Sequence, residues 1–163
     1  MLKKMLLLMF IPFMTTLFAI DVTSCHLYTI SEAPIWVDLF DYNLNITPTN
    51  EDIKYGYMMV LVDKQENREE KCLFMRRAFK ITSKNGARDN NNFWVELNPA
   101  VEQLFLHSIR VYRHGMWYDF TPNTQVKTED YDSPYIDLIF RISSLEPGDI
   151  CEMQYTKRDQ SIF

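Results

Sequence analysis

The sequence predicts an all-β protein with an antiparallel, β-sandwich-like fold. Three observations lead to this prediction. At least seven short segments rich in aromatic and β-branched residues follow one another, turn-forming residues separate them at short intervals, and no segment shows the apolar period of a long amphipathic helix. With 47% hydrophobic and 14% aromatic residues, the chain of 163 residues can bury the core of one domain.

The first twenty residues differ from the rest and predict a signal peptide over 1–20. Two lysines precede an uncharged apolar run from Met5 to Ala19, which at about 15 residues is shorter than a membrane-spanning helix. We therefore expect export to the periplasm or cell envelope, with an uncleaved anchor as an alternative. Lipid attachment at Cys25 is a second alternative, which the charge of Asp21 disfavours.

An extended entry and a hairpin are predicted next. The stretch 33–37 contains a proline, and because the residue before a proline is kept out of the α region, it is extended rather than helical. Residues 43–52 are polar and predict a loop. Residues 55–63 and 70–83 have the composition of strands, and the charged residues 65–69 between them predict an antiparallel hairpin.

The middle of the chain predicts a second hairpin. A polar segment, 84–92, separates the first hairpin from a strand over 93–97. Residues 104–113 then alternate, and His114-Gly115 supplies a tight turn before a partner strand over 116–120. The alternation predicts one face with Leu106, Ser108, Arg110 and Tyr112, and the other with Phe105, His107, Ile109, Val111 and Arg113.

Two further strands are predicted near the C-terminal end, over 135–142 and 150–156, with a Pro-Gly turn over 145–149 between them. Glu152 and Gln154 share one face of the last strand, so we expect that face of the sheet to be wet. An apolar tail directly follows this strand, and a natural sheet seldom leaves such an edge uncovered. We therefore expect a truncated part of a larger architecture.

Several short motifs occur in an order that is typical of one family. They are Pro34-Ile35-Trp36-Val37, Gly56-Tyr57 followed by Leu61-Val62-Asp63-Lys64-Gln65, Leu106 to Gly115, and Leu145 to Tyr155. The chain resembles the bacterial domain of unknown function that precedes the transglutaminase-like core in exported or envelope-bound proteins. After the signal peptide and an entry segment over 21–33, the resemblance identifies 34–163 as the N-terminal part of this domain.

The resemblance implies a β-sandwich accessory module whose partner is a transglutaminase-like domain or an envelope protein. The family domain usually continues beyond the strand at 150–156, and the papain-like core with its Cys, His and Asp follows later still; neither is found in this sequence. The resemblance therefore implies no catalytic residue within the module, and we predict that the chain is not an enzyme.

Charge and metal-ligand spacing exclude further classes of function. The 17 Lys and Arg residues against 22 Asp and Glu residues give a net charge of -5, which provides no basic surface for nucleic acid. Three cysteines (Cys25, Cys72, Cys151) and three histidines (His26, His107, His114) have no metal-ligand spacing, so no metal and no cofactor are predicted. Two of the cysteines could pair in an oxidising compartment, but buried reduced thiols are favoured.

For the cysteines and the carboxylates near the C-terminal strand, the sequence favours a structural role over a catalytic one. Cys151 is flanked by Glu152, whose charge would raise the pKa of its thiol, and Cys72 lies in an apolar strand. Asp149 and Glu152 point in different directions across a turn and a strand, so they do not form a glycosidase pair, and Asp149 is expected to cap the turn. The three tryptophans, Trp36, Trp94 and Trp117, suit a core or a groove for a sugar or peptide, and the sequence leaves both open.

Three hypotheses follow. The favoured one is a non-catalytic accessory or interaction module of a transglutaminase-like envelope protein. The alternative is a stand-alone secreted protein that binds a peptide or glycan through an aromatic face or an open sheet edge. The least favoured is an independent cysteine enzyme, which a Cys and a His in contact within a cleft would support.

Overall fold

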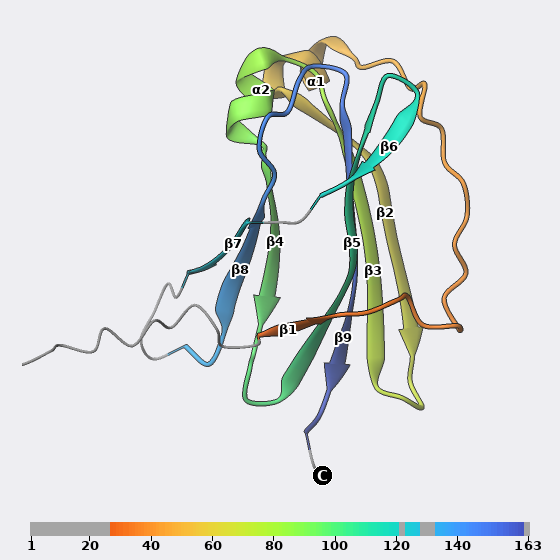
Figure 1. Ribbon diagram of the computed structural model, residues 1–163, viewed down its shortest axis with the longest axis vertical. Coiled ribbons are helices and arrows are strands. Elements are labelled where there is room, and N and C mark those ends of the chain that lie inside the picture. Colours follow the sequence, from red (N-terminus) through yellow and green to blue (C-terminus); the bar gives the residue numbers. More distant parts are fainter. Residues whose placement is uncertain (1–26, 121–122, 128–132, 162–163) are drawn as a thin grey trace, which may run out of the picture.

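The computed structural model describes residues 27–120, 123–127 and 133–161 (Figure 1). The predicted signal peptide, Cys25 and His26 lie outside these residues. The described elements are β1 (Tyr28–Ile30), α1 (Asn50–Tyr55), β2 (Tyr57–Asn67), β3 (Cys72–Ile81), α2 (Lys84–Asp89), β4 (Asn92–Leu97), β5 (Glu102–Arg113), β6 (Met116–Asp119), β7 (Asn123–Lys127), β8 (Ile136–Arg141) and β9 (Ile150–Asp159).

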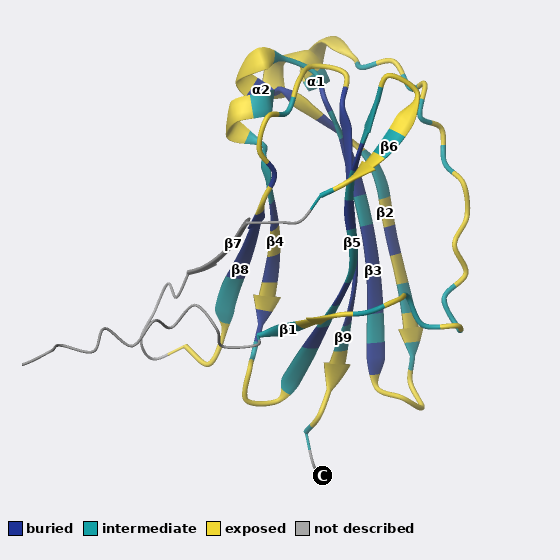
Figure 2. Ribbon diagram, in the orientation of Figure 1, coloured by how far each residue is buried: buried dark blue, intermediate teal, exposed yellow. Residues whose placement is uncertain are grey.

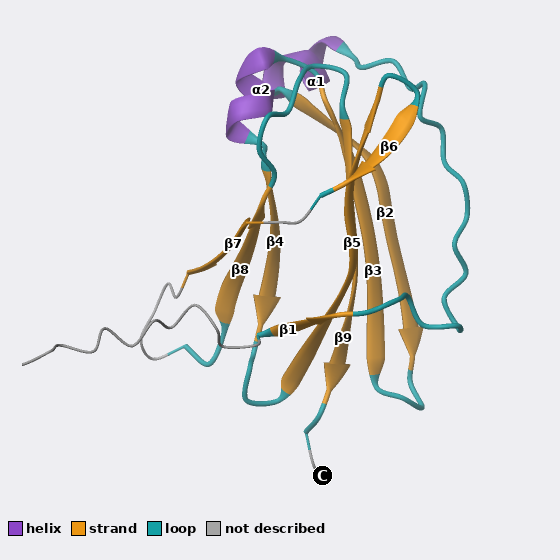
Figure 3. Ribbon diagram, in the orientation of Figure 1, coloured by secondary structure: helices purple, strands orange, loops and turns teal. Residues whose placement is uncertain are grey.

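Strands dominate the fold and form two sheets, which confirms the predicted all-β class (Figure 3). The larger sheet has the order β1-β5-β9-β3-β2, with β6 also paired to β5, and the smaller has the order β4-β8-β7. All described pairs are antiparallel except β1 with β5, which is parallel. The hairpin β2-β3 and the hairpin β5-β6, with His114 and Gly115 at positive φ in its turn, are both confirmed.

The core lies between the two sheets, where dark blue residues line the facing strands in Figure 2. Phe79 on β3 meets Phe93 on β4 with ring centroids 5.0 Å apart, so the sheets share one apolar layer. The buried residues of this layer include Met75, Ile81, Val95, Leu104, Ile109, Val111, Leu138, Phe140, Cys151 and Met153.

The opposite face of the large sheet is also covered, which corrects the prediction of a wet face on the last strand. Glu152 and Gln154 are 0% and 6% exposed. The segment 31–49 is held over this face by its own main chain: Arg76 Nη1 donates to the carbonyl of Phe40 at 2.7 Å. Lys80 Nζ likewise donates to the carbonyl of Ile46 at 2.8 Å. The prediction failed because this cover is distant in sequence from β9.

A bulge corrects the predicted alternation of β5. The pairing of β5 with β9 shifts register between Leu106 and Ser108. As one extra residue reverses which side a strand presents, the apolar side chains of Leu106 and Ile109 both reach the core. His107 is therefore on the outer face, away from Ile109, with which the simple alternation had grouped it.

Two helices of six residues each stand where loops were predicted, at one end of the sandwich. Thr49 caps α1 and Ser83 caps α2 through side-chain oxygens that accept N–H groups of the first turn. The helices touch at two glycines, since a Cβ on Gly86 would lie 1.7 Å from the carbonyl oxygen of Gly56. Neither helix, nor any other in the described residues, has the length and apolar character to cross a membrane.

Candidate binding groove between β2 and β4

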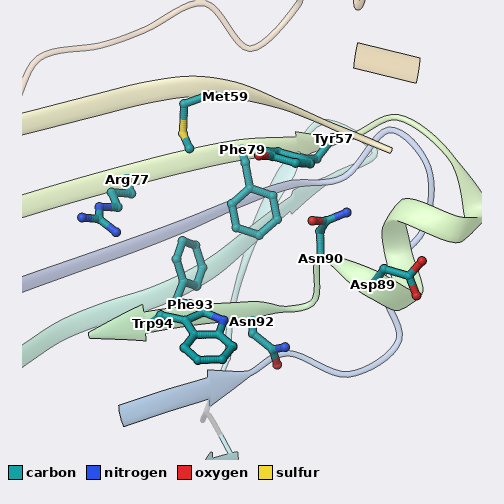
Figure 4. Close-up of a pocket in the computed structure, with 9 residues that line it drawn as sticks. All are labelled: Tyr57, Met59, Arg77, Phe79, Asp89, Asn90, Asn92, Phe93 and Trp94. Carbon is teal, nitrogen blue, oxygen red and sulfur yellow. The ribbon is translucent and has the colours of Figure 1, made fainter. Parts of the chain in front are cut away.

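A groove of about 240 Å³ opens between the inner side of the large sheet and β4 of the small one (Figure 4). Aromatic and aliphatic side chains form most of its wall. They come from β2, β3 and β4 and are Tyr57, Met59, Phe79, Phe93 and Trp94. Polar groups lie among them: Arg77 on β3, Asn92 on β4, and Asp89 and Asn90 at the end of α2.

The groove exists because the small sheet does not cover β2. Tyr57, Met59 and Val62 pair with Ile81, Phe79 and Arg77 of β3 and therefore share the inner side of the sheet. Yet Met59 and Val62 are 49% and 59% exposed, whereas Asp63 on the outer side is buried. Strand β2 is thus buried on the side that the N-terminal segment covers and open on the side that normally holds a core.

Arg77 is the unusual residue of this groove. It lies on the inner face of β3 between Met75 and Phe79, and its register partners are Val62 on β2 and Met153 on β9. Its side chain is half-buried among these apolar neighbours. In the described part of the chain Arg77 makes no hydrogen bond and no ion pair, so its five N–H donors are available to a ligand.

The adjacent Arg76 points to the other side and has a complete set of partners. Its Nε donates to Glu152 Oε2 at 3.0 Å, while Arg110 Nε donates to Glu152 Oε1 at 2.7 Å. Gln154 Nε2 donates to the same Oε1. Burial alone would raise the pKa of Glu152, but the hydrogen bonds from Arg110 and Gln154 and the charges of both arginines hold that pKa below its usual range.

The network around Glu152 fastens the N-terminal segment rather than forming a site for a substrate. The Tyr42 ring lies against the Arg76 guanidinium, 5.1 Å from ring centroid to Cζ, and burial raises the pKa of its hydroxyl. Trp117 covers the second arginine, with 4.1 Å from its ring centroid to Cζ of Arg110. Glu152 and Arg76 are thus buried, whereas Arg110 keeps part of its side chain exposed.

A second pocket, of about 210 Å³, is lined by Cys72 and His107 together with Arg158. Each of the two side chains is bonded elsewhere. Cys72 Sγ accepts from Arg158 Nε at 3.3 Å and lies 3.4 Å from the carbonyl oxygen of Glu70. The ring of His107 bridges the Ser31 carbonyl and the Thr156 hydroxyl.

The two groups in this pocket are not joined as a nucleophile and its base, because no hydrogen bond connects Cys72 to His107 in the described structure. Burial lowers the pKa of His107, which favours its neutral form, although the hydrogen bond that its ring donates to the Ser31 carbonyl opposes this effect. A neutral His107 uses one ring nitrogen as donor and the other as acceptor, and both are occupied. The pocket therefore does not provide Cys72 with a histidine base.

The other candidate residues from the sequence, Cys151, Asp149 and Glu152, have contacts that indicate a structural role. Cys151 is fully buried in the core, and burial raises the pKa of its thiol far above neutrality. Asp149 accepts from the Glu146 N–H at 2.7 Å, which confirms its role in the turn, and binds Arg113 through both carboxylate oxygens. Asp149 and Glu152 hold different arginines, so they form no carboxylate pair.

Of the three tryptophans, Trp94 borders the groove from the outer face of β4, Trp36 lies in a turn of the N-terminal segment, and Trp117 packs on Arg110. The described residues contain no cluster of three or more His, Cys, Asp or Glu side chains that could hold a metal ion. Arg77 was not among the candidate residues predicted from the sequence. The sequence does contain a signal for it: Arg77 is two residues from both Met75 and Phe79, the spacing at which side chains share one face of a strand.

A protein-family model described as "Domain of Unknown Function with solved-structure structure (DUF3857)" matches residues 72–163. Among solved structures, the chain is similar to a crystal structure described as a "putative protease" from Parabacteroides distasonis, with 13% identity and a TM-score of 0.51. The similarity covers 56% of this chain and 20% of that chain, so this chain matches only a small part of that protein's length. No curated protein matches the sequence.

Proposed function

The chain belongs to the DUF3857 family, and from this premise we propose that it is a non-catalytic accessory module that binds a transglutaminase-like envelope protein. The observation that carries the proposal is the open inner side of β2, where exposed Met59 and Val62 adjoin the aromatic groove. A sheet face that is apolar and uncovered favours contact with another polypeptide.

The surroundings of the reactive side chains support a role without chemistry. A thiol becomes a nucleophile only as thiolate, and the buried Cys151 has a raised pKa that keeps it protonated near neutral pH. Both ring nitrogens of His107 are engaged in hydrogen bonds, one with Ser31 directly after β1 and one with Thr156 on β9. Neither residue is arranged to transfer a proton to a bound substrate.

Export to the cell envelope is part of the proposal and rests on the charged and apolar pattern of residues 1–20. The partner then belongs to the same compartment. The similarity to a much longer chain is consistent with a module that works beside other domains, although that similarity concerns the fold alone.

The experiment is to identify the transglutaminase-like protein encoded nearest to this gene, produce its core, and titrate it into the purified chain by isothermal calorimetry. We expect one binding site with a Kd of about 1 μM or tighter, and no acyl-transfer or proteolytic activity in the chain alone. A genome with no such neighbour, or a core that does not bind, would contradict the proposal.

A further inference from the structure

We infer that the groove between β2 and β4 binds an extended peptide segment of a partner polypeptide, and that a carboxylate of this segment pairs with Arg77 while its apolar side chains pack on Tyr57 and Met59. The inference specifies what the module proposed above would recognise, and so it rests on that proposed function.

The charge of Arg77 defines the first element of recognition. A guanidinium placed between Met75 and Phe79 has lost part of its hydration without gaining an acceptor among the described residues. A carboxylate reaching it through the groove would form a two-pronged, charge-assisted contact in a partly apolar setting. The buried Arg76 differs in this respect, because its guanidinium donates to the carboxylate of Glu152. The acid that lines the groove, Asp89, pairs with Arg88, and no acid among the described residues pairs with Arg77.

Apolar contact defines the second element. Tyr57 and Met59 lie two residues apart on the inner side of β2, and Phe93 points toward the same side from β4 (Figure 4). In an extended peptide, side chains two residues apart are about 7 Å apart on one face, which matches the repeat of the strand that they would contact. An acidic side chain at the level of Arg77 would then have an apolar side chain beside it on the same face.

Main-chain pairing defines the third element. In the described residues β4 is the last strand of the small sheet, and β2 is the last strand of the large one. A strand added beside β4 would extend the small sheet over the uncovered side of β2, at the spacing of about 10 Å that separates stacked sheets. This arrangement favours a peptide strand over a sugar or a small anion, because only a peptide supplies strand hydrogen bonds and alternating side chains together.

The test is a selection of random nine-residue peptides on the purified protein, carried out with the wild type and with R77Q, R77K and R68Q. Arg68 is exposed in the β2-β3 turn, outside the groove, so R68Q is a control with the same change of charge. Circular dichroism and urea unfolding establish that each variant is folded, and R77K retains the charge if R77Q is unstable.

We expect the wild type and R68Q to enrich peptides that share one Asp or Glu beside apolar residues. For the best peptide, R77Q should weaken binding at least about tenfold and R77K by less, and replacing the acid by its amide should weaken binding to the wild type but not further to R77Q. No enriched peptide, a consensus without an acid, equal binding by R77Q, or occupation of the groove by a second copy of the chain would overturn the inference.

The outcome is separable from that of the proposed function. If the transglutaminase-like core binds the wild type and R77Q equally, the accessory role stands and the role of Arg77 is wrong. If acidic peptides depend on Arg77 but the core does not bind, the groove is established and the proposed partner is wrong.

Discussion

Arg76 and Glu152 form an ion pair with Nη2 and Oε2 2.9 Å apart, on a sheet face that the chain itself buries. Glu152 also accepts from Arg110, so one carboxylate on β9 binds guanidinium groups from both flanking strands, β3 and β5. The carbonyl of Phe40 takes another donor of Arg76. The pair thereby connects β3, β9 and the N-terminal segment.

Replacing this carboxylate should destabilise the fold strongly. E152Q leaves two arginines without their counter-charge inside the protein, and we expect a loss of about 3 to 5 kcal/mol in the free energy of unfolding. Urea unfolding followed by tryptophan fluorescence measures it. E66Q is the matched control: the exposed Lys64–Glu66 pair, 2.9 Å apart, should contribute no measurable stability. A midpoint of E152Q equal to that of E66Q would contradict the role of the network.

The carboxylate of Glu152 should also make the free energy of unfolding depend on pH. The pKa of Glu152 lies below its usual range in the folded protein, so its contribution is complete above the unfolded pKa of about 4.3 and is lost as the pH falls through the lower folded value. We expect the stability difference between wild type and E152Q to be constant from about pH 7 to 5 and to shrink below about pH 4. A difference that does not change down to about pH 3 would show that folding does not lower the pKa of Glu152.

The contact of the two helices should not tolerate a methyl group. A Cβ at position 86 would lie 1.7 Å from the Gly56 carbonyl oxygen, which is main chain and cannot move aside cheaply. We expect G86A to lose about 4 kcal/mol or more. In G115A the new Cβ meets nothing within 4 Å, so only the strain of its positive φ remains, about 1 kcal/mol. Thermal unfolding of both variants decides whether the clash or the backbone conformation dominates.

Neither described cysteine should behave as an active-site thiol. In a C25S background, we expect iodoacetamide at neutral pH to leave Cys72 and Cys151 unmodified for minutes in the folded protein and to label both in urea, because both are buried. Mass spectrometry of tryptic peptides gives the readout. Rapid labelling of Cys72 alone would revive the enzyme hypothesis, since Arg158 Nε lies 3.3 Å from its sulfur.

Local pattern predicted most strands and both hairpins, because alternation and turn residues such as His114-Gly115 act over a few positions. The sequence did not reveal contacts between segments that are far apart along the chain. The face of β9 with Glu152 looked solvent-exposed because its cover, the segment that includes Phe40, is more than a hundred residues away.

The groove was equally hidden in the sequence. A polar residue on one face of a strand usually marks the wet side, and Arg77 would have been assigned to it. Only the register of β3 against β2 and β9 places Arg77 on the inner face, where the small sheet leaves β2 uncovered. The short helices were missed because six residues are too few to show an apolar period.

The most direct test of the account is photo-crosslinking from the open side of β2. Benzoylphenylalanine replaces Met59 in one variant and Tyr118 on β6 in another, two positions with similar exposure of 49% and 43%. In the native cells, we predict a covalent adduct with the transglutaminase-like partner from position 59 and none from position 118. An adduct from position 118 alone, or none from position 59, would contradict the claim that this groove binds another polypeptide.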